Sequence, residues 1–419
     1  MKKMKRKVIV LIIALCVCSS TFAQLSIEAC YEKAESNYPL IKQHGLIEKS
    51  GYYNLSNIGK GYLPQIQFFA KATYQSEVTK IPIQMPGLEG LSKDQYGATL
   101  EINQSIWDGG SRKAQQKNVR TQTEVNRMNL NVTVYAVRER VNQLYFGILL
   151  HNEMLNQNTL YQEELKRNFT QISAYMQNGI ANQADLDAVE VEQIKAIQSR
   201  TELSYSRKAY IEMLAVLIAE KIDENTQLIK PDINQPCSPD NQRLELSLYE
   251  AQFRDLDARK QEVYAGLRPQ FNLFVTGGYS RPGLNMLENK FSAYCMGGIS
   301  LIWNFGGLYT RKNKLNNIEV NRSMIESQRE TFLFNSRLDI TQNSNEIQKI
   351  REVLNSDNHI IRIRSSVKRS AETKVANGTL SVLELMKEVN AEQQAIQDRI
   401  VHEIELMQAI YNLKYITNN

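Results

Sequence analysis

Glycine and proline are scarce in two long stretches of this chain. The nine prolines all lie within residues 39–86 and 231–282. Only two glycines occur within residues 111–230, and Gly378 is the only one from residue 308 onward. Proline in a helix interior costs about 3 kcal/mol and glycine about 1 kcal/mol. These two stretches are therefore free to form unusually long helices.

Long apolar runs are also missing. No segment has the roughly 20 apolar residues that a membrane-spanning helix needs. The apolar run Val8–Val17 follows five basic residues and precedes Thr21-Phe22-Ala23, which offers small residues at positions −3 and −1. We therefore predict a signal peptide over residues 1–23, cleaved before Gln24. A lipoprotein signal is less favoured, because Leu15 and Val17 stand before Cys16 and Cys18, where small residues are expected.

Charge and cysteine content exclude several classes. The formal charge of +5 comes from the five basic residues of the predicted signal, since 45 Lys+Arg and 45 Asp+Glu remain without it. A nucleic-acid-binding protein would need a basic face, so we expect no nucleic-acid partner. The remaining cysteines are Cys30, Cys237 and Cys295, an odd and widely spaced set that implies no disulfide framework.

Catalytic and metal-binding motifs are missing from the sequence. The four histidines are isolated, and neither His-Glu-x-x-His nor Cys-x-x-Cys occurs. Gly-x-Ser-x-Gly, the nucleophile motif of many hydrolases, does not occur either. We expect no enzymatic activity, no cofactor and no metal site.

Two Asn-Gly dipeptides divide the glycine-poor stretches into helical hairpins. Asn and Gly both tolerate positive φ, so Asn178-Gly179 and Asn377-Gly378 each predict a reversal of the chain. The outgoing legs would be about 100 Å long at 1.5 Å per residue, several times the diameter of a small domain. The predicted outgoing legs are 111–178 and 308–377, the returning legs 180–230 and 379–417, and two shorter helices 27–62 and 241–266.

Four segments alternate in polarity as β-strands do, at 65–75, 96–106, 270–280 and 294–303. In the first, Ile66, Phe68, Ala70, Ala72 and Tyr74 share one face, and in the second Tyr96, Ala98, Leu100, Ile102 and Ile106 do. The faces of the fourth, glycine-rich segment are ambiguous. About ten alternating residues suit a half-buried soluble strand or a transmembrane strand, and the predicted export favours the membrane. A lipid-embedded sheet must close, and known barrels have at least eight strands, so this chain would have to oligomerise.

The same order of signals occurs twice, about 200 residues apart. Pro64, Ile106-Trp107-Asp108-Gly109-Gly110 and Asn178-Gly179 correspond to Pro269, Ile302-Trp303-Asn304-Phe305-Gly306-Gly307 and Asn377-Gly378. Such a long-period duplication indicates one structural unit built twice. We divide the chain into a first repeat at 24–230, a linker at 231–240 and a second repeat at 241–419.

These duplicated motifs resemble those of the TolC-like outer-membrane efflux proteins over essentially the whole mature chain. The resemblance implies a mainly α protein with a small β part. Its long antiparallel hairpins would form a periplasmic α-barrel. Its four strands would contribute to a 12-stranded β-barrel that a homotrimer closes in the outer-membrane lipid. The implied role is a passive exit duct that works with a periplasmic adaptor protein and an inner-membrane pump of the resistance-nodulation-division or ABC type.

The resemblance also suggests residues for the periplasmic entrance. Glu384 matches an acidic constriction position of the family, and a trimer would make a ring of three carboxylates there. Lys387 occupies a second position that is acidic in the family, and the latch positions for arginine and tyrosine read Leu380 and Val375. Ser381-Val382-Leu383-Glu384 is also a capping box, and Asp185 stands in a looser equivalent. Glu384 therefore has a gate role and a purely capping role as alternatives.

The remaining candidates lie at the hairpin tips and at the strand ends. Asn178, Gly179, Asn377 and Gly378 would form the tips that dock the adaptor. Trp107 and Trp303 could anchor the barrel at the membrane interface or pack at the junction with the helices. The pairs Gly109-Gly110 and Gly306-Gly307 would relieve the bend from strand to helix.

Other functions stay open at this point. A type I protein-secretion duct or a metal-efflux duct fits the same architecture, because the partner pump would select the cargo. A soluble periplasmic coiled-coil scaffold is a rival from a different class.

Overall fold

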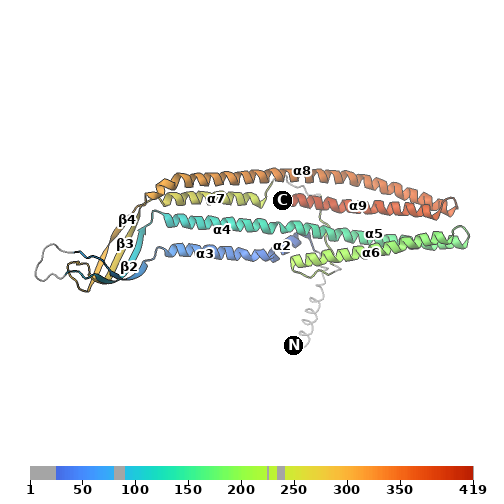
Figure 1. The fold of residues 1–419 in the computed structure, drawn as a ribbon. Coiled ribbons are helices and arrows are strands. Elements are labelled where there is room, and N and C mark those ends of the chain that lie inside the picture. The colour runs from blue at the N-terminus through green and yellow to red at the C-terminus, as the bar shows by residue number, and fades with distance from the viewer. Residues whose placement is uncertain (1–24, 80–89, 224–225, 234–240, 419) are drawn as a thin grey trace, which may run out of the picture. The chain divides into compact units, whose positions relative to one another are not determined.

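A computed structural model describes residues 25–79, 90–223, 226–233 and 241–418 (Figure 1). The predicted signal peptide, Cys237 and most of the predicted linker lie outside these residues. The chain divides into two compact units. Unit 1 contains Met1–Ile41, Asn131–Leu244 and Thr331–Asn419, and unit 2 contains Lys42–Leu130 and Glu245–Glu330. In the part of the chain that the structure describes, no helix combines the length and apolarity needed to cross a bilayer.

Unit 1 consists of two helical hairpins and a short N-terminal helix. The first hairpin is α5 followed by α6, and the second is the end of α8 followed by α9. The last residues of α4 also belong to this unit. The bounds are α2 Ile27–Asn37, α4 Ser111–Tyr135, α5 Val137–Gln177, α6 Gln183–Ile218, α8 Gly306–Ala376 and α9 Val382–Thr417.

Unit 1 has two separate apolar cores. One surrounds Tyr145 and Phe146 and packs α2 against α5, α6, α8 and α9. The other lies near the hairpin turns and joins α5 and α6 to α8 and α9. The hairpins therefore hold each other along their apolar stripes, as the helical spacing of these residues requires.

Two predicted helices end earlier than the sequence suggests. The stretch 27–62 breaks at Tyr38, whose φ of −61° and ψ of 127° are extended. Pro39 follows it, and a residue before proline is pushed out of the helical region. The predicted returning leg 180–230 ends at Ile218, where Ala219 takes a left-handed φ of 52°.

Tertiary contacts explain the second of these corrections. Leu25 N donates to Gln227 O at 3.2 Å, and Ile229 N donates to Leu25 O at 3.2 Å. The buried Tyr145 hydroxyl lies within hydrogen-bond distance of Leu25 O and Ile229 O, at 2.8 and 2.7 Å. Residues 227–229 are thereby paired with Leu25, which lies just before α2.

The two described cysteines are both free. Cys30 is buried in the core of unit 1, and burial raises the pKa of its thiol to about 12. Cys295 is exposed on the fourth strand.

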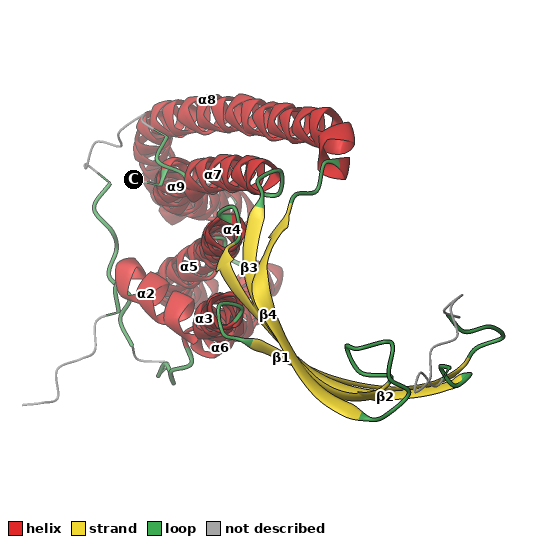
Figure 2. Cartoon of the chain, turned by 90° about the vertical axis from the view of Figure 1, so that its left-hand side faces the viewer, coloured by secondary structure: helices red, strands yellow, loops and turns green. Residues whose placement is uncertain are grey.

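Unit 2 contains one antiparallel sheet and the helices that flank it in sequence. The four strands are hydrogen-bonded in the order β1-β2-β3-β4, and Figure 2 shows the sheet strongly curved. The strands of the two halves of the chain therefore pair with each other between β2 and β3. The bounds are β1 Gln65–Tyr74, β2 Asp94–Trp107, β3 Gln270–Arg281 and β4 Ser292–Ile302, with helices α3 Gln43–Lys60 and α7 Leu244–Ala265, most of α4 and the start of α8.

The register gives the sheet one apolar face. Phe68 pairs with Leu100, Leu100 with Gly277, and Gly277 with Cys295. Because side chains alternate along a strand, this row fixes the face of every strand. The face carries Ile66, Phe68, Ala70 and Ala72 of β1; Ala98, Leu100 and Ile102 of β2; Leu273, Val275 and Tyr279 of β3; and Ala293, Cys295, Gly297, Ile299 and Leu301 of β4. The ambiguity of the fourth strand is thereby resolved.

One predicted position on this face is wrong. The register between β2 and β3 shifts between Ser105 and Trp107, so that Trp107 and not Ile106 pairs with Phe271. The extra residue of such a bulge reverses the alternation beyond it. The bulge places Trp107 on the apolar face.

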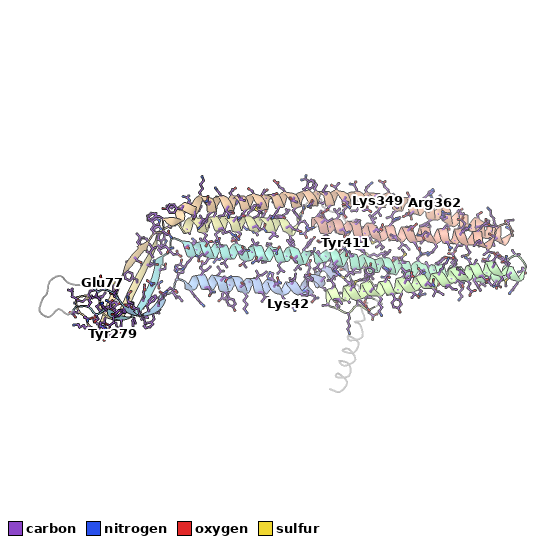
Figure 3. All side chains as sticks on the ribbon, in the orientation of Figure 1. Lys42, Glu77, Tyr279, Lys349, Arg362 and Tyr411 are labelled. Atoms are coloured by element: carbon purple, nitrogen blue, oxygen red, sulfur yellow. The ribbon has the colours of Figure 1, made fainter. Side chains whose placement is uncertain are left out.

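Aromatic side chains gather at both ends of the sheet. Near its helical end, the Trp107 ring lies 5.9 Å from the Phe271 ring, and the Trp303 ring 4.8 Å from the Phe305 ring. Near the other end, Phe291 lies between Tyr96 and Tyr279, with centroid distances of 6.4 and 5.4 Å. Figure 3 labels Tyr279 there, at the loop end of the strands. Two aromatic rows with an apolar face between them are typical of strands that cross a membrane.

Candidate functional site: hairpin turns and strand–helix junctions

The two hairpin turns have the same hydrogen bonds. Gly179 N donates to Met176 O at 3.1 Å and Ile180 N to Tyr175 O at 2.9 Å. Their counterparts Gly378 N and Thr379 N donate to Val375 O and Lys374 O, each at 2.9 Å. This pair of bonds defines a Schellman motif, which needs positive φ at the residue after the cap. Gly179 and Gly378 provide it, with φ of 72° and 67°.

The asparagine of each turn completes the helix end. Asn178 Nδ2 donates to Ala174 O, and Asn377 Nδ2 donates to Thr373 O, each at 2.9 Å. A Cβ atom added at either glycine would meet no atom within 4 Å. The turns therefore require glycine for its backbone conformation alone, and they leave open space around it.

The helices that leave the turns begin with complete capping boxes. Asp185 N donates to Asn182 Oδ1 at 3.1 Å, and Asn182 N donates to Asp185 Oδ2 at 3.0 Å. Glu384 N donates to Ser381 Oγ at 3.2 Å, and Ser381 N donates to Glu384 Oε2 at 3.3 Å. The predicted capping role of Asp185 and Glu384 is thus confirmed. Glu384 is nevertheless exposed, so its carboxylate also faces solvent.

The other predicted entrance positions differ in exposure. Lys387 is exposed one turn beyond Glu384. Val375 and Leu380, at the latch positions of the resembled family, pack with the core near the turns. Figure 1 shows the turns after α5 and α8 at the same end of unit 1.

Polar contacts join the two hairpins beside this core. Gln157 Nε2 donates to Gln393 Oε1 at 3.0 Å, and the Tyr161 hydroxyl donates to Asn390 Oδ1 at 2.6 Å. Burial raises the pKa of Tyr161, so this hydroxyl keeps its proton and acts as a donor. The contacts alternate with apolar ones and fix the pairing of α5 with α9.

One of these contacts is a charged triad that the sequence analysis did not predict. Lys368 Nζ of α8 lies 2.7 Å from Glu164 Oε1 of α5 and also forms an ion pair with Glu392 of α9. Burial alone would lower the pKa of Lys368, but its bonds to the two carboxylates leave that pKa raised. A signal exists in the sequence, because Lys368 stands on the helical stripe of Ala371 and Val375, and Glu392 on that of Leu385 and Val389.

The first strand–helix junction depends on Asp108 and the two glycines after it. Asp108 is buried, and its carboxylate accepts from Gly110 N at 3.0 Å and from Arg112 N at 2.8 Å. Gly109 and Gly110 have φ of 70° and 85°. A Cβ atom on Gly109 would lie 2.8 Å from Arg268 Cβ and 3.2 Å from Pro269 O. The predicted role of this pair in the bend is therefore supported by both conformation and space.

The second junction is built differently, which corrects the expectation that both glycine pairs act alike. Gly306 and Gly307 are the first residues of α8, and neither is among the positive-φ glycines. Asn304 Oδ1 accepts from Gly306 N at 2.9 Å and replaces the carboxylate of Asp108. Here close packing matters, because a Cβ on Gly307 would lie 3.0 Å from Leu267 Cδ2. The Trp303 side chain is half exposed and donates from Nε1 to Leu267 O at 3.0 Å.

These features define a class of protein. Long helical hairpins with matching turns, together with a sheet that has one apolar face, are the parts of an outer-membrane channel subunit with an attached helical tunnel. In the described ranges, no group of three or more His, Cys, Asp or Glu could hold a metal ion.

Comparison with known proteins agrees with this class. The model of the outer membrane efflux protein family matches residues 30–220. The fold is similar to that of the outer-membrane channel OprN, with a TM-score of 0.71 and 13% identity over 93% of this chain and 89% of that chain. The fold is also similar to that of CusC, with a TM-score of 0.71 and 12% identity over 94% of this chain and 92% of that chain. For the MtrE outer-membrane channel of Neisseria gonorrhoeae, the TM-score is 0.66 and the identity 12%, over 94% of this chain and 89% of that chain. No curated protein sequence matches the chain significantly.

Residues 30–220 therefore match the outer membrane efflux protein family, and the fold of the chain is that of TolC-like outer-membrane channels. The matched family and the structural neighbours belong to the outer membrane. The family and the structural neighbours are channels and not enzymes.

The triad gives a test of how the hairpins are held together. Lys368→Met would leave the buried Glu392 and the partly buried Glu164 without this partner and should lower the free energy of unfolding by about 3–5 kcal/mol. The triple variant Lys368→Met, Glu164→Gln and Glu392→Gln should recover most of the lost free energy of unfolding. In the wild type, the stabilisation by the Lys368 ion pairs should be complete at pH values below the ordinary lysine pKa of about 10.4. It should be lost as the pH rises through the raised pKa of Lys368. Denaturant unfolding of the purified protein measures both effects.

Lys374→Met is the matched control, since Lys374 is exposed on the same helix. It should change the free energy of unfolding by no more than about 0.5 kcal/mol. Equal losses in the two single variants would mean that the triad does not hold the hairpins.

Proposed function

We propose that three copies of this chain form a passive exit duct through the outer membrane. The sheet carries this proposal, because it has one apolar face and two open edges, at β1 and β4. Strand edges cannot stay unpaired in lipid. Three copies would supply twelve strands, and pairing β1 of one copy with β4 of the next would close the barrel. The family resemblance supports three copies.

The alternation of the strands supports a membrane position for this sheet. Its strands contain 10 to 14 residues, and a transmembrane strand needs about 9–11. The soluble scaffold is less favoured, since it would leave side chains such as Phe68, Ile66 and Ile299 exposed to water, at 68, 65 and 69% of their surface. In the proposed barrel, the apolar face meets lipid.

The helical part would continue the duct into the periplasm. Each copy would contribute two repeats, 24–230 and 241–419, with the linker 231–240 at the belt of the tunnel. The tips at Asn178-Gly179 and Asn377-Gly378 would dock a periplasmic adaptor, which joins the duct to an energised inner-membrane pump. Their matching backbones and the open space at both glycines support this role. The pump would decide whether the cargo is a small solute, a metal ion or a protein.

The trimeric barrel is tested by charge substitutions on the two faces of one strand. Phe68→Lys places a charge on the apolar face and should cost about 2–4 kcal/mol in a bilayer. Gln67→Lys, on the opposite face of β1, should cost little. Native mass spectrometry of detergent-extracted outer membranes should find trimers for the wild type and for Gln67→Lys, and strongly reduced trimers for Phe68→Lys.

The wild-type trimer should also conduct ions in planar bilayers. Recovery of the wild type as a soluble periplasmic monomer without detergent would overturn the proposal. Equal trimer yields from both lysine variants would show that the apolar face does not meet lipid.

The proposed gate role of Glu384 can be separated from its capping role. Glutamine also completes a capping box, so Glu384→Gln removes the charge and keeps the helix start. A ring of three carboxylates attracts cations, and its loss should make the channel less cation-selective. The reversal potential under a salt gradient measures this change. Glu405→Gln, an exposed carboxylate further along α9, is the control. An unchanged reversal potential in Glu384→Gln would leave capping as the only role.

The docking role of the tips is tested at Gly378. Proline cannot adopt the φ of 67° found there, and it lacks the N–H that donates to Val375 O. Gly378→Pro should abolish pump-dependent export while trimers and conductance persist. Gly378→Asn should retain export, because asparagine tolerates the left-handed conformation. Normal export by the proline variant would contradict the tip assignment.

A further inference from the structure

The long helices that follow strands β2 and β4 begin with an excess of basic residues. Residues 109–123 contain Arg112, Lys113, Lys117 and Arg120 and no acidic residue. Residues 306–318 contain Arg311, Lys312 and Lys314, again with no acidic residue. The positive end of the helix dipole disfavours cations in the first turn of α4, where Arg112 and Lys113 lie. By contrast, α6 and α9 have Asp185 and Glu384 in their first turns.

Three of these cations line a cavity in unit 2, together with Arg268 and neighbouring residues. The cavity has a volume of about 920 Å³ and is lined by Lys113, Lys117 and Arg120 of α4, by Arg268, and by Tyr62 and Tyr264. The Arg311 guanidinium lies 5.3 Å from the centre of the Tyr264 ring, so α8 adds a cation at the same wall. No Asp or Glu is among the described residues that line the cavity.

Two carboxylates close in sequence to the lining residues, Asp108 and Glu262, have other partners. Asp108 accepts two backbone N–H groups at the start of α4 and forms an ion pair with Arg112 at 3.6 Å. Glu262 accepts from Asn118 Nδ2. Lys117 Nζ donates to the neutral Gln261 Oε1 at 3.0 Å. The positive charge of the cavity is therefore not balanced from within its own wall.

The cavity lies beside the helical end of the sheet, where Trp107 and Trp303 are found. Arg268 Nη1 donates to Gly109 O at 3.3 Å, two residues after Trp107. The preceding residue, Leu267, accepts the Trp303 indole N–H at 3.0 Å. Interfacial tryptophans mark the level of lipid headgroups in membrane proteins. A basic cavity at this level is placed to meet headgroup phosphates.

We propose that this cavity binds the phosphate of an anionic glycerophospholipid from the inner leaflet of the outer membrane. Lys113, Lys117, Arg120 and Arg268 would hold the phosphate, and Tyr62 and Tyr264 would flank the glycerol. The proposal rests on the proposed membrane position of the sheet. It gives the unfavourable cations at the start of α4 a partner that only the membrane supplies.

Lipid binding by the purified full-length protein tests the proposal. Native mass spectrometry would compare phosphatidylglycerol with phosphatidylcholine. The wild type should bind phosphatidylglycerol preferentially. Lys113→Gln with Lys117→Gln should weaken phosphatidylglycerol binding about fivefold for each lysine, with phosphatidylcholine unchanged. Lys113→Arg with Lys117→Arg should restore the preference.

The control is Lys166→Gln with Lys208→Gln, which removes two exposed lysines of unit 1 and should keep the preference. Equal loss in the control, or no loss in the cavity variant, would overturn the proposal. Displacement of phosphatidylglycerol by equimolar glycerol phosphate would show a site for free anions and overturn the lipid assignment. Trimer mass and conductance measured on the same variants report separately on the proposed duct.

Discussion

The unpaired edges of a four-stranded sheet are the constraint on which the rest of this structure depends. β1 and β4 each have a neighbour on one side only, and the sheet has one continuous apolar face. Burying that face in lipid makes unpaired backbone groups intolerable. Both demands are satisfied together only when further strands complete the sheet. The proposed trimer satisfies both demands, because the strands of its other two copies would complete the sheet.

A second constraint acts between the hairpins. Their apolar stripes are narrow, and polar side chains such as Tyr161 and Gln393 share the contact with them. An apolar seam alone would tolerate sliding of one hairpin along the other. The Lys368 ion pairs and the hydrogen bonds beside them favour a single register, because any other register leaves buried polar groups without partners. Stability and specificity are supplied here by different residues.

Local patterns predicted the elements of this protein well. Glycine and proline scarcity predicted the long helices, Asn-Gly predicted the two turns, and alternation predicted the strands. Local patterns could not predict the effects of contacts between residues far apart in the sequence. Ala219 ends α6 in a left-handed conformation without glycine, because residues 227–229 are bound to Leu25. The pairing of β2 with β3 joins residues nearly 200 positions apart, and the bulge before Trp107 reverses the face of that side chain. The entrance role proposed for Glu384 came from a resemblance, whereas the helical stripes that carry Lys368 and Glu392 did not tell which residues would pair.

The duplicated turn has a consequence for symmetry. Each turn runs from an Asn-Gly pair through a cap three residues after the glycine to an acidic side chain three residues further on, with the same backbone bonds in both copies. Around a threefold axis, such turns would present six nearly equal backbone surfaces that differ in their side chains. A partner that recognises the backbone shape of the turns would have six equivalent binding positions. A partner that recognises the side chain of Ile180 or of Thr379 would have only three. Such a pseudo-sixfold rim would therefore allow two stoichiometries from a single ring.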